Sequence, residues 1–153
     1  MKFSTREDIE APIDFVFEQV TDFTSFERSI MRRGGDIERI ADGAENGLGA
    51  KWQVRFQLRG VERDISATVS EVSEPTSLKI SLTSRSADAE MKIDLVPLSR
   101  ARTRLRVDAQ ATAKSIATKL LFKSARFAKQ KTEGRFNSVV AGFAADVDKR
   151  YLR

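Results

Sequence analysis

Few side chains in this sequence could carry out chemistry, and two absences narrow the choice further. The 153 residues include neither histidine nor cysteine, so the commonest general base, the commonest metal ligand and the thiolate nucleophile are all missing. Acid–base work could fall only to aspartate, glutamate, lysine, tyrosine or arginine, and no catalytic arrangement of these residues stands out. We therefore predict no catalytic residue, no metal site and no cofactor.

Two charged residues nevertheless occupy unexpected positions. Arg63 and Glu71 share the alternating phase of an apolar set, which consists of Ile65, Ala67 and Val69. An arginine that points inward could bind a carboxylate or phosphate of a ligand. Alternatively, both residues lie at strand ends, where a long side chain reaches water or a bulge reverses the phase. We rank Arg63 above Glu71 as a ligand contact.

Strands must position these residues, because apolar and polar side chains alternate through most of residues 36–113. This period of two is typical of strands with one buried face and one face in water. The inward sets are Trp52, Val54, Phe56 and Leu58; Val61, Ile65, Ala67 and Val69; Leu78, Ile80 and Leu82; Met91, Ile93 and Leu95; and Leu105, Val107, Ala109 and Ala111. With residues 2–10 and 37–41 they make about seven strands. The short turns between them, one at residues 97–100, imply an antiparallel meander.

Helices are expected in the chain before residue 36 and after residue 113. Pro12 suits the first turn of a short helix, and residues 24–27 (TSFE) form a capping box that starts a second one. Residues 114–153 contain no proline and predict one long helix, in which a bend is allowed. Its apolar stripe consists of Leu121, Ala125, Ala128, Phe136, Val139, Val140, Phe143, Val147 and Tyr151. A helix with one apolar side must bury it, so we predict an α+β fold in which a curved antiparallel sheet wraps around this helix.

Length and composition agree with one soluble domain over residues 1–153. Hydrophobic residues make up 41% of the chain and charged residues 32%, which is typical of globular proteins. The first residues lack the apolar core of a signal peptide, and no segment approaches the roughly 20 apolar residues of a transmembrane helix. We therefore expect a cytoplasmic protein, with its oligomeric state left open.

The order of these elements, together with several short motifs, resembles a known family. The motifs are residues 11–17 (APIDFVF), 20–23 (VTDF), 47–52 (GLGAKW), 59–63 (RGVER), 96–98 (VPL) and 103–105 (TRL). In this order they resemble the helix-grip fold of the START and birch-pollen-allergen superfamily, in particular its bacterial polyketide cyclase/dehydrase-like and coenzyme-Q-binding members. The resemblance covers nearly the whole chain.

The resemblance implies a cavity between the sheet and the C-terminal helix that holds a hydrophobic small molecule, such as a lipid, quinone or polyketide. Its candidate lining is Phe26, Met31, Trp52, Val54, Phe56, Arg63, Leu82, Met91, Ile93, Phe136, Val140 and Phe143. Phe26 and Met31 could form a lid. A cyclase or lyase that uses the same cavity is the second hypothesis, because a fold alone does not choose between carriage and catalysis. At most single positions, an apolar residue filling the core is the more common explanation.

Basic charge collects at the end of the chain. Residues 100–153 hold 14 lysines and arginines against 4 aspartates and glutamates. An apolar ridge flanked by basic residues is typical of a helix at a membrane surface, and the candidate residues are Lys119, Leu120, Lys123, Arg126, Phe127 and Lys131. Alternatively, the helix breaks near Lys123 and these residues pack inside the protein. Nucleic acid ranks below both, because outward strand positions show no aromatic residue on which bases could stack.

Overall fold

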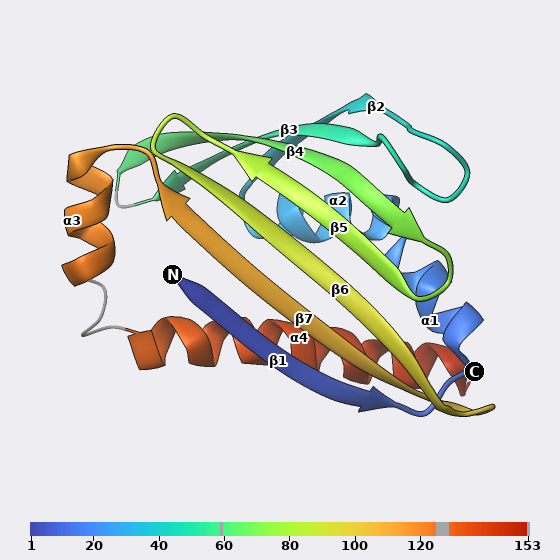
Figure 1. Cartoon of the computed structure of the whole chain (residues 1–153). Helices are drawn as coiled ribbons and strands as arrows, with labels where there is room; N and C mark the ends of the chain where they lie inside the picture. Colours follow the sequence, from blue (N-terminus) through green and yellow to red (C-terminus); the bar gives the residue numbers. More distant parts are fainter. Residues whose placement is uncertain (59, 125–128, 153) are drawn as a thin grey trace.

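The computed structural model describes residues 1–58, 60–124 and 129–152. Within them the chain forms a β-strand, two short helices, six further strands and two more helices (Figure 1). The elements are β1 (Lys2–Ile9), α1 (Ile13–Val20), α2 (Phe23–Arg32), β2 (Asp36–Ala41), β3 (Lys51–Leu58), β4 (Val61–Ser73), β5 (Ser77–Thr83), β6 (Ala87–Ser99), β7 (Arg102–Ala113), α3 (Ile116–Ser124) and α4 (Lys129–Tyr151).

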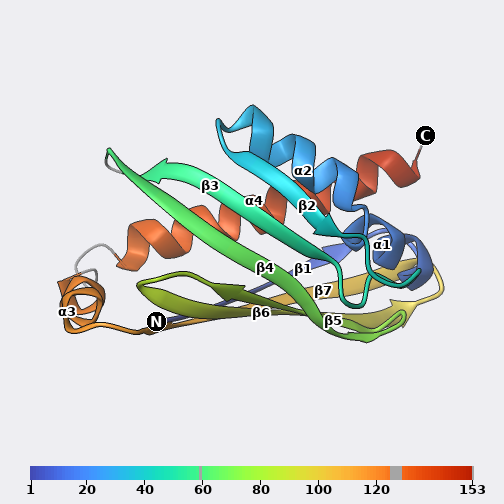
Figure 2. The same cartoon turned by 90° about the horizontal axis from the view of Figure 1, so that it is seen from above.

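The strands form one curved antiparallel sheet of seven strands in the order β1-β7-β6-β5-β4-β3-β2. From β2 to β7, each strand pairs with its neighbour in the sequence, and β1 adds to the free edge of β7. The helix α4 runs along the concave side of the sheet, and α1 and α2 lie on that side as well (Figures 1 and 2). The predicted α+β helix-grip architecture is confirmed, including the two short helices between β1 and β2.

The core lies where α1, the end of α4 and the sheet meet. Its largest fully buried apolar side chains are Ile9, Val16, Val69, Leu78, Leu105 and Val147. Thr103 is also fully buried, and its hydroxyl donates a hydrogen bond of 2.8 Å to the backbone oxygen of Ala11. This bond satisfies the one polar atom of the Thr103 side chain and fixes the segment between β1 and α1 to β7.

The expected single C-terminal helix is two helices, α3 and α4, which point in different directions (Figure 1). The first of them therefore ends close to Lys123, where a break was expected. Two residues of the predicted stripe, Ala125 and Ala128, lie outside the described residues. The buried residues of α4 are Val140, Ala144 and Val147. Leu121, by contrast, is 50% exposed. The stripe fails at Leu121 because a helical phase is not conserved across two separate helices. Two stripe residues on α4 itself are also exposed, Val139 at 50% and Tyr151 at 42%.

A second difference concerns the turn predicted at residues 97–100. The strand β6 continues through Pro97 to Ser99, with a register shift between these two residues. Strand β5 pairs with β6 only as far as Asp94. Beyond that residue β6 has β7 as its one partner, and a proline is tolerated where a strand lacks a second neighbour.

Candidate ligand-binding site

On the concave face of the sheet, the apolar side chains are buried at one end of the strands and only half-buried further along them. Leu78, Ile93 and Val107 form one cross-strand row, and all three are buried. The next row, Ile80, Met91 and Ala109, is half-buried, and so is the row of Leu82, Ala89 and Ala111 that follows. The change arises because α1 covers one end of the sheet, whereas Phe136 in the first half of α4 packs on Phe3 of β1, with ring centroids 5.8 Å apart. The apolar rows of β5 and β6 are left partly exposed.

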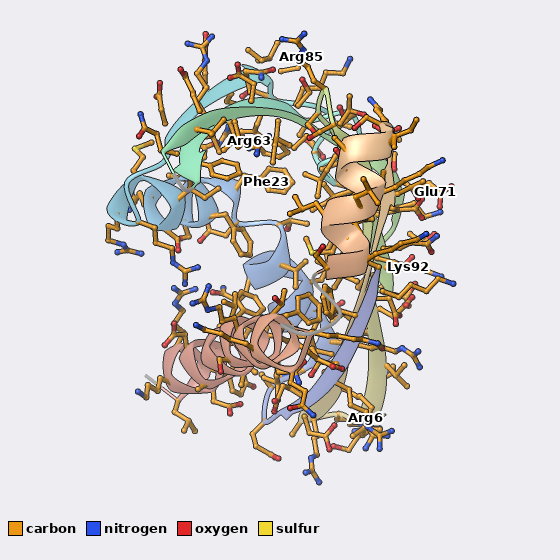
Figure 3. All side chains as sticks on the ribbon, turned by 90° about the vertical axis from the view of Figure 1, so that its left-hand side faces the viewer. Arg6, Phe23, Arg63, Glu71, Arg85 and Lys92 are labelled. Atoms are coloured by element: carbon orange, nitrogen blue, oxygen red, sulfur yellow. The ribbon has the colours of Figure 1, made fainter. Side chains whose placement is uncertain are left out.

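Strands β3 and β4 extend this partly covered surface. Val54 pairs with Ile65, and Phe56 pairs with Arg63, and all four side chains are half-buried. Figure 3 shows Arg63 beneath the arch of the sheet, on the same side as Phe23 of α2. The inward phase predicted for Arg63 is therefore correct.

Arg63 is a cation on an otherwise apolar part of the surface. The adjacent Asp64 pairs with Arg55 instead, at 3.0 Å on the outward face. Within residues 1–58, 60–124 and 129–152, Arg63 forms no ion pair. A half-buried guanidinium with free N–H groups can donate hydrogen bonds to a carboxylate, phosphate or enolate oxygen of a ligand.

The inward position considered for Glu71 is wrong. A register shift between Val69 and Glu71 reverses the alternation of β4, so that Val72 is half-buried and Glu71 is exposed. Glu71 Oε2 lies 3.3 Å from Lys79 Nζ of the neighbouring strand. Figure 3 shows Glu71 on the outer side of the sheet. The bulge that the sequence left open as an alternative therefore explains this residue.

A groove of about 650 Å³ lies between α2 and α4. The rings of Phe26 and Phe143 stack in it with centroids 5.6 Å apart, and Phe26 remains 40% exposed. Four arginines contribute to its lining, namely Arg28, Arg32, Arg33 and Arg150. Met31, which the sequence paired with Phe26 as a lid, is 53% exposed and does not line the groove.

The remaining predicted lining residues fall into two groups. Trp52, Ile93 and Val140 are buried members of the core. The half-buried group consists of Val54, Phe56, Leu82, Met91, Phe136 and Phe143. The first group fills the interior, which agrees with the alternative that such apolar residues belong to the core. The second group retains exposed surface that could contact a ligand.

Sequence reasoning missed the role of Glu27. The predicted capping box does not form, because the N-cap is Asp22, two residues before Thr24, and Asp22 accepts the hydrogen bond from the backbone nitrogen of Ser25 at 3.2 Å. Glu27 Oε2 instead accepts hydrogen bonds from Arg39 Nε at 2.6 Å and from Trp52 Nε1 at 2.8 Å. Burial alone would raise the pKa of the Glu27 carboxyl, but these two hydrogen bonds lower it below its ordinary value. A motif of four residues could not reveal this role, because the partners Arg39 and Trp52 lie on strands β2 and β3.

The basic residues proposed for a membrane or partner surface are divided by the break between α3 and α4. Lys119, Leu120 and Lys123 are exposed on α3, and Lys131 is exposed on α4. Arg126 and Phe127 lie outside the described residues. Among the helices of the described part of the chain, none is long and apolar enough to cross a membrane.

Comparison with known proteins identifies the fold and not a close relative. No family model matches the sequence, and no curated protein matches it either. Among solved structures, the Zhui aromatase/cyclase from a Streptomyces species has a TM-score of 0.70 at 12% identity, covering 100% of this chain and 96% of that one. A START superfamily protein from Mycobacterium smegmatis has a TM-score of 0.58 at 16% identity, covering 90% of this chain and 98% of that one.

A third solved structure, Ara h 8.0201, is an allergen of the birch-pollen type. It has a TM-score of 0.62 at 16% identity and covers 96% of this chain and 97% of that one. At such identities the likeness concerns the arrangement of the backbone and not the ligand. The chain has the helix-grip fold that these START, aromatase/cyclase and birch-pollen-allergen proteins share.

Proposed function

We propose that this protein binds a hydrophobic small molecule between the concave face of its sheet and α4. One observation carries the proposal: inward apolar side chains pass from buried at Leu78 and Ile93 to half-buried at Leu82 and Met91. Apolar residues that face inward but keep water contact gain free energy when an apolar ligand covers them. The ligand-binding floor proposed here consists of Val54, Phe56, Ile65, Ile80, Leu82 and Met91.

Arg63 gives this ligand a second property. A cation beside an apolar floor favours an amphiphile whose acidic or enolic oxygen reaches the guanidinium while its body lies on the floor. Fatty acids, acidic polyketides and hydroxylated quinones all have this form. We propose Arg63 as the polar contact of the site.

The groove between α2 and α4 is the route we propose for entry to this floor. Phe143 packs against the core cluster and also lines the groove, where it stacks on Phe26. Separation of these two rings would connect the groove with the concave face. In this proposal Phe26 retains the lid role that the sequence gave it, and Met31 does not.

A cyclase or lyase acting on the same ligand is the second candidate. The observation in its favour is again Arg63, because a fixed cation can stabilise the negative charge that develops on an enolate oxygen. Turnover of a polyketide or other hydrophobic substrate by the purified protein, lost in Arg63→Ala but with substrate binding retained, would favour catalysis over carriage.

The binding proposal is tested with the purified protein in two steps. Native mass spectrometry should detect a copurifying hydrophobic molecule, or a titration with anilinonaphthalene sulfonate should reach a defined stoichiometry. Leu82→Trp should then weaken fluorophore binding by about tenfold, since the larger ring fills the floor at a modest cost in stability. The matched control is Val96→Trp, which adds the same ring at an exposed position of β6. Equal binding by a folded Leu82→Trp variant and by the control would contradict the proposed site.

A further inference from the structure

The helix α3 presents its apolar side chains to water. Its N-terminus is capped by Ser115, whose Oγ accepts a hydrogen bond from the backbone nitrogen of Thr118 at 3.1 Å. Thr118 is buried and Phe122, one turn later, is half-buried, so these two residues mark the face that packs on the protein. At 100° per residue, Ile116 and Leu120 lie on the opposite face. They are 77% and 59% exposed.

The surroundings of this apolar face are basic. Lys119 and Lys123 are exposed on the same outward side as Ile116 and Leu120, and Leu121, half-exposed, adjoins them on the other flank. The sequence contains no aspartate or glutamate from residue 109 to residue 132. Lys114 is not available to a partner in the same way, because its Nζ lies 2.9 Å from Asp88 Oδ1.

We propose that α3 docks on an anionic lipid bilayer. Ile116, Leu120 and Leu121 enter the interface between headgroups and acyl chains, and Lys119 and Lys123 bind the lipid phosphates and carboxylates. An exposed apolar face flanked by lysines is complementary to this partner, since the bilayer offers apolar contact beneath a layer of negative charge. An acidic protein surface would match the lysines and leave the apolar residues unsatisfied.

The position of α3 in the fold suits a planar partner. It stands at one end of the molecule, beyond the strands and apart from α4 (Figures 1 and 2). A flat surface can therefore approach its outward face from outside the body of the protein. The proposal rests on α3 alone and does not depend on the ligand proposed for the concave face.

Vesicle co-sedimentation of the full chain tests this inference. Vesicles of phosphatidylcholine with phosphatidylserine should bind the protein at low salt, and vesicles of phosphatidylcholine alone should bind it at least about tenfold less. Lys119→Glu with Lys123→Glu should lower partition into the anionic vesicles by at least about 25-fold, because the loss of each basic residue near such a surface costs roughly a fivefold factor and the new carboxylates are repelled in addition. The matched control, Arg6→Glu with Arg100→Glu, makes the same change of charge at exposed positions away from α3 and should bind nearly as the wild type does.

A second variant tests whether apolar side chains insert into the bilayer, as distinct from the attraction between lysines and anionic lipids. Ile116→Ser with Leu120→Ser should weaken vesicle binding by at least about tenfold without altering the fold, because both side chains are exposed. Equal vesicle binding by this variant and the wild type would overturn the proposal. A wild-type dimer that this variant dissociates, together with no binding to vesicles, would overturn it as well and would assign the surface to a second copy of the chain.

Discussion

The ring of Phe26 stacks on the ring of Phe143, with centroids 5.6 Å apart and planes inclined by 26°. This pair links α2 to α4 beside the groove between the two helices. Phe143 packs against the core cluster, whereas Phe26 is 40% exposed, so little core packing holds Phe26 on its partner. In the binding proposal, this stack is therefore the element that would open to give access to the concave face.

The first prediction concerns Phe143. Phe143→Trp should weaken binding of anilinonaphthalene sulfonate by about tenfold, because the larger ring occupies space at the junction of groove and core, and it should cost about 1–3 kcal/mol of stability through overpacking. Binding is measured by fluorescence titration and stability by urea denaturation. The control is Tyr151→Trp, at the end of the same helix, where the ring packs on Phe15 with centroids 5.0 Å apart. Unchanged binding in a folded Phe143→Trp variant would move the site elsewhere.

The second prediction separates a polar contact at Arg63 from a purely apolar site. Arg63→Gln should weaken binding of a fatty acid by at least about tenfold, since a hydrogen bond to a charged group contributes about 1.5–3 kcal/mol. It should leave binding of the fatty alcohol of the same chain length almost unchanged. Arg55→Gln is the matched control, because Arg55 lies on the neighbouring strand and pairs with Asp64 on the outward face. Isothermal titration calorimetry gives both affinities, and an equal loss for acid and alcohol would refute a specific charge contact.

The third prediction is the pH dependence that Glu27 imposes. The pKa of the Glu27 carboxyl is lower in the folded protein than its ordinary value, because Arg39 and Trp52 donate hydrogen bonds to the ionised form. Its contribution to stability is therefore present above the unfolded pKa of about 4.3 and is lost as the pH falls through the folded pKa. Glu27→Gln should lower the free energy of unfolding by about 1–3 kcal/mol near neutral pH.

The same variant provides its own internal check. The difference in unfolding free energy between Glu27→Gln and the wild type should shrink in acid, where the wild-type carboxyl is protonated and resembles the amide. Urea denaturation at a series of pH values measures this difference. Glu18→Gln, at an exposed position of α1, is the control and should show a small effect at every pH. A Glu27→Gln effect that persists unchanged in acid would mean that shape, and not charge, holds Arg39 and Trp52.

The sequence predicts the sheet well because alternation is a local property. Leu78, Ile80 and Leu82 face inward as expected, since a strand with one wet face repeats every two residues. Alternation also placed Glu71 on the inward face, and there the prediction is wrong. The bulge before it depends on how β4 pairs with β5, where Lys79 lies opposite Glu71, and the alternation of a single strand does not decide between a bulge and an inward glutamate.

The candidate site was harder to predict than the fold for a related reason. Alternation places Trp52 and Val54 on the same face, but only the position of the covering helices decides that Trp52 is buried and Val54 is not. Glu27 likewise fits a capping box by spacing, and tertiary partners on β2 and β3 take it instead. Local sequence rules identify the face of an element, whereas the degree of burial and the choice between two partners depend on distant residues.

The pairing of β1 with β7 has a consequence for the time course of folding. Ser4 of β1 and Asp108 of β7 are joined by a hydrogen bond of 2.6 Å but are 104 residues apart in the chain. During synthesis the strands from β2 to β7 can pair one after another with a neighbour just made, whereas β1 leaves the ribosome first and waits longest for its partner. Contacts of such long range slow folding. Until β7 emerges, β1 has no strand to pair with, and this interval is when the nascent chain is most prone to aggregate and most in need of a chaperone.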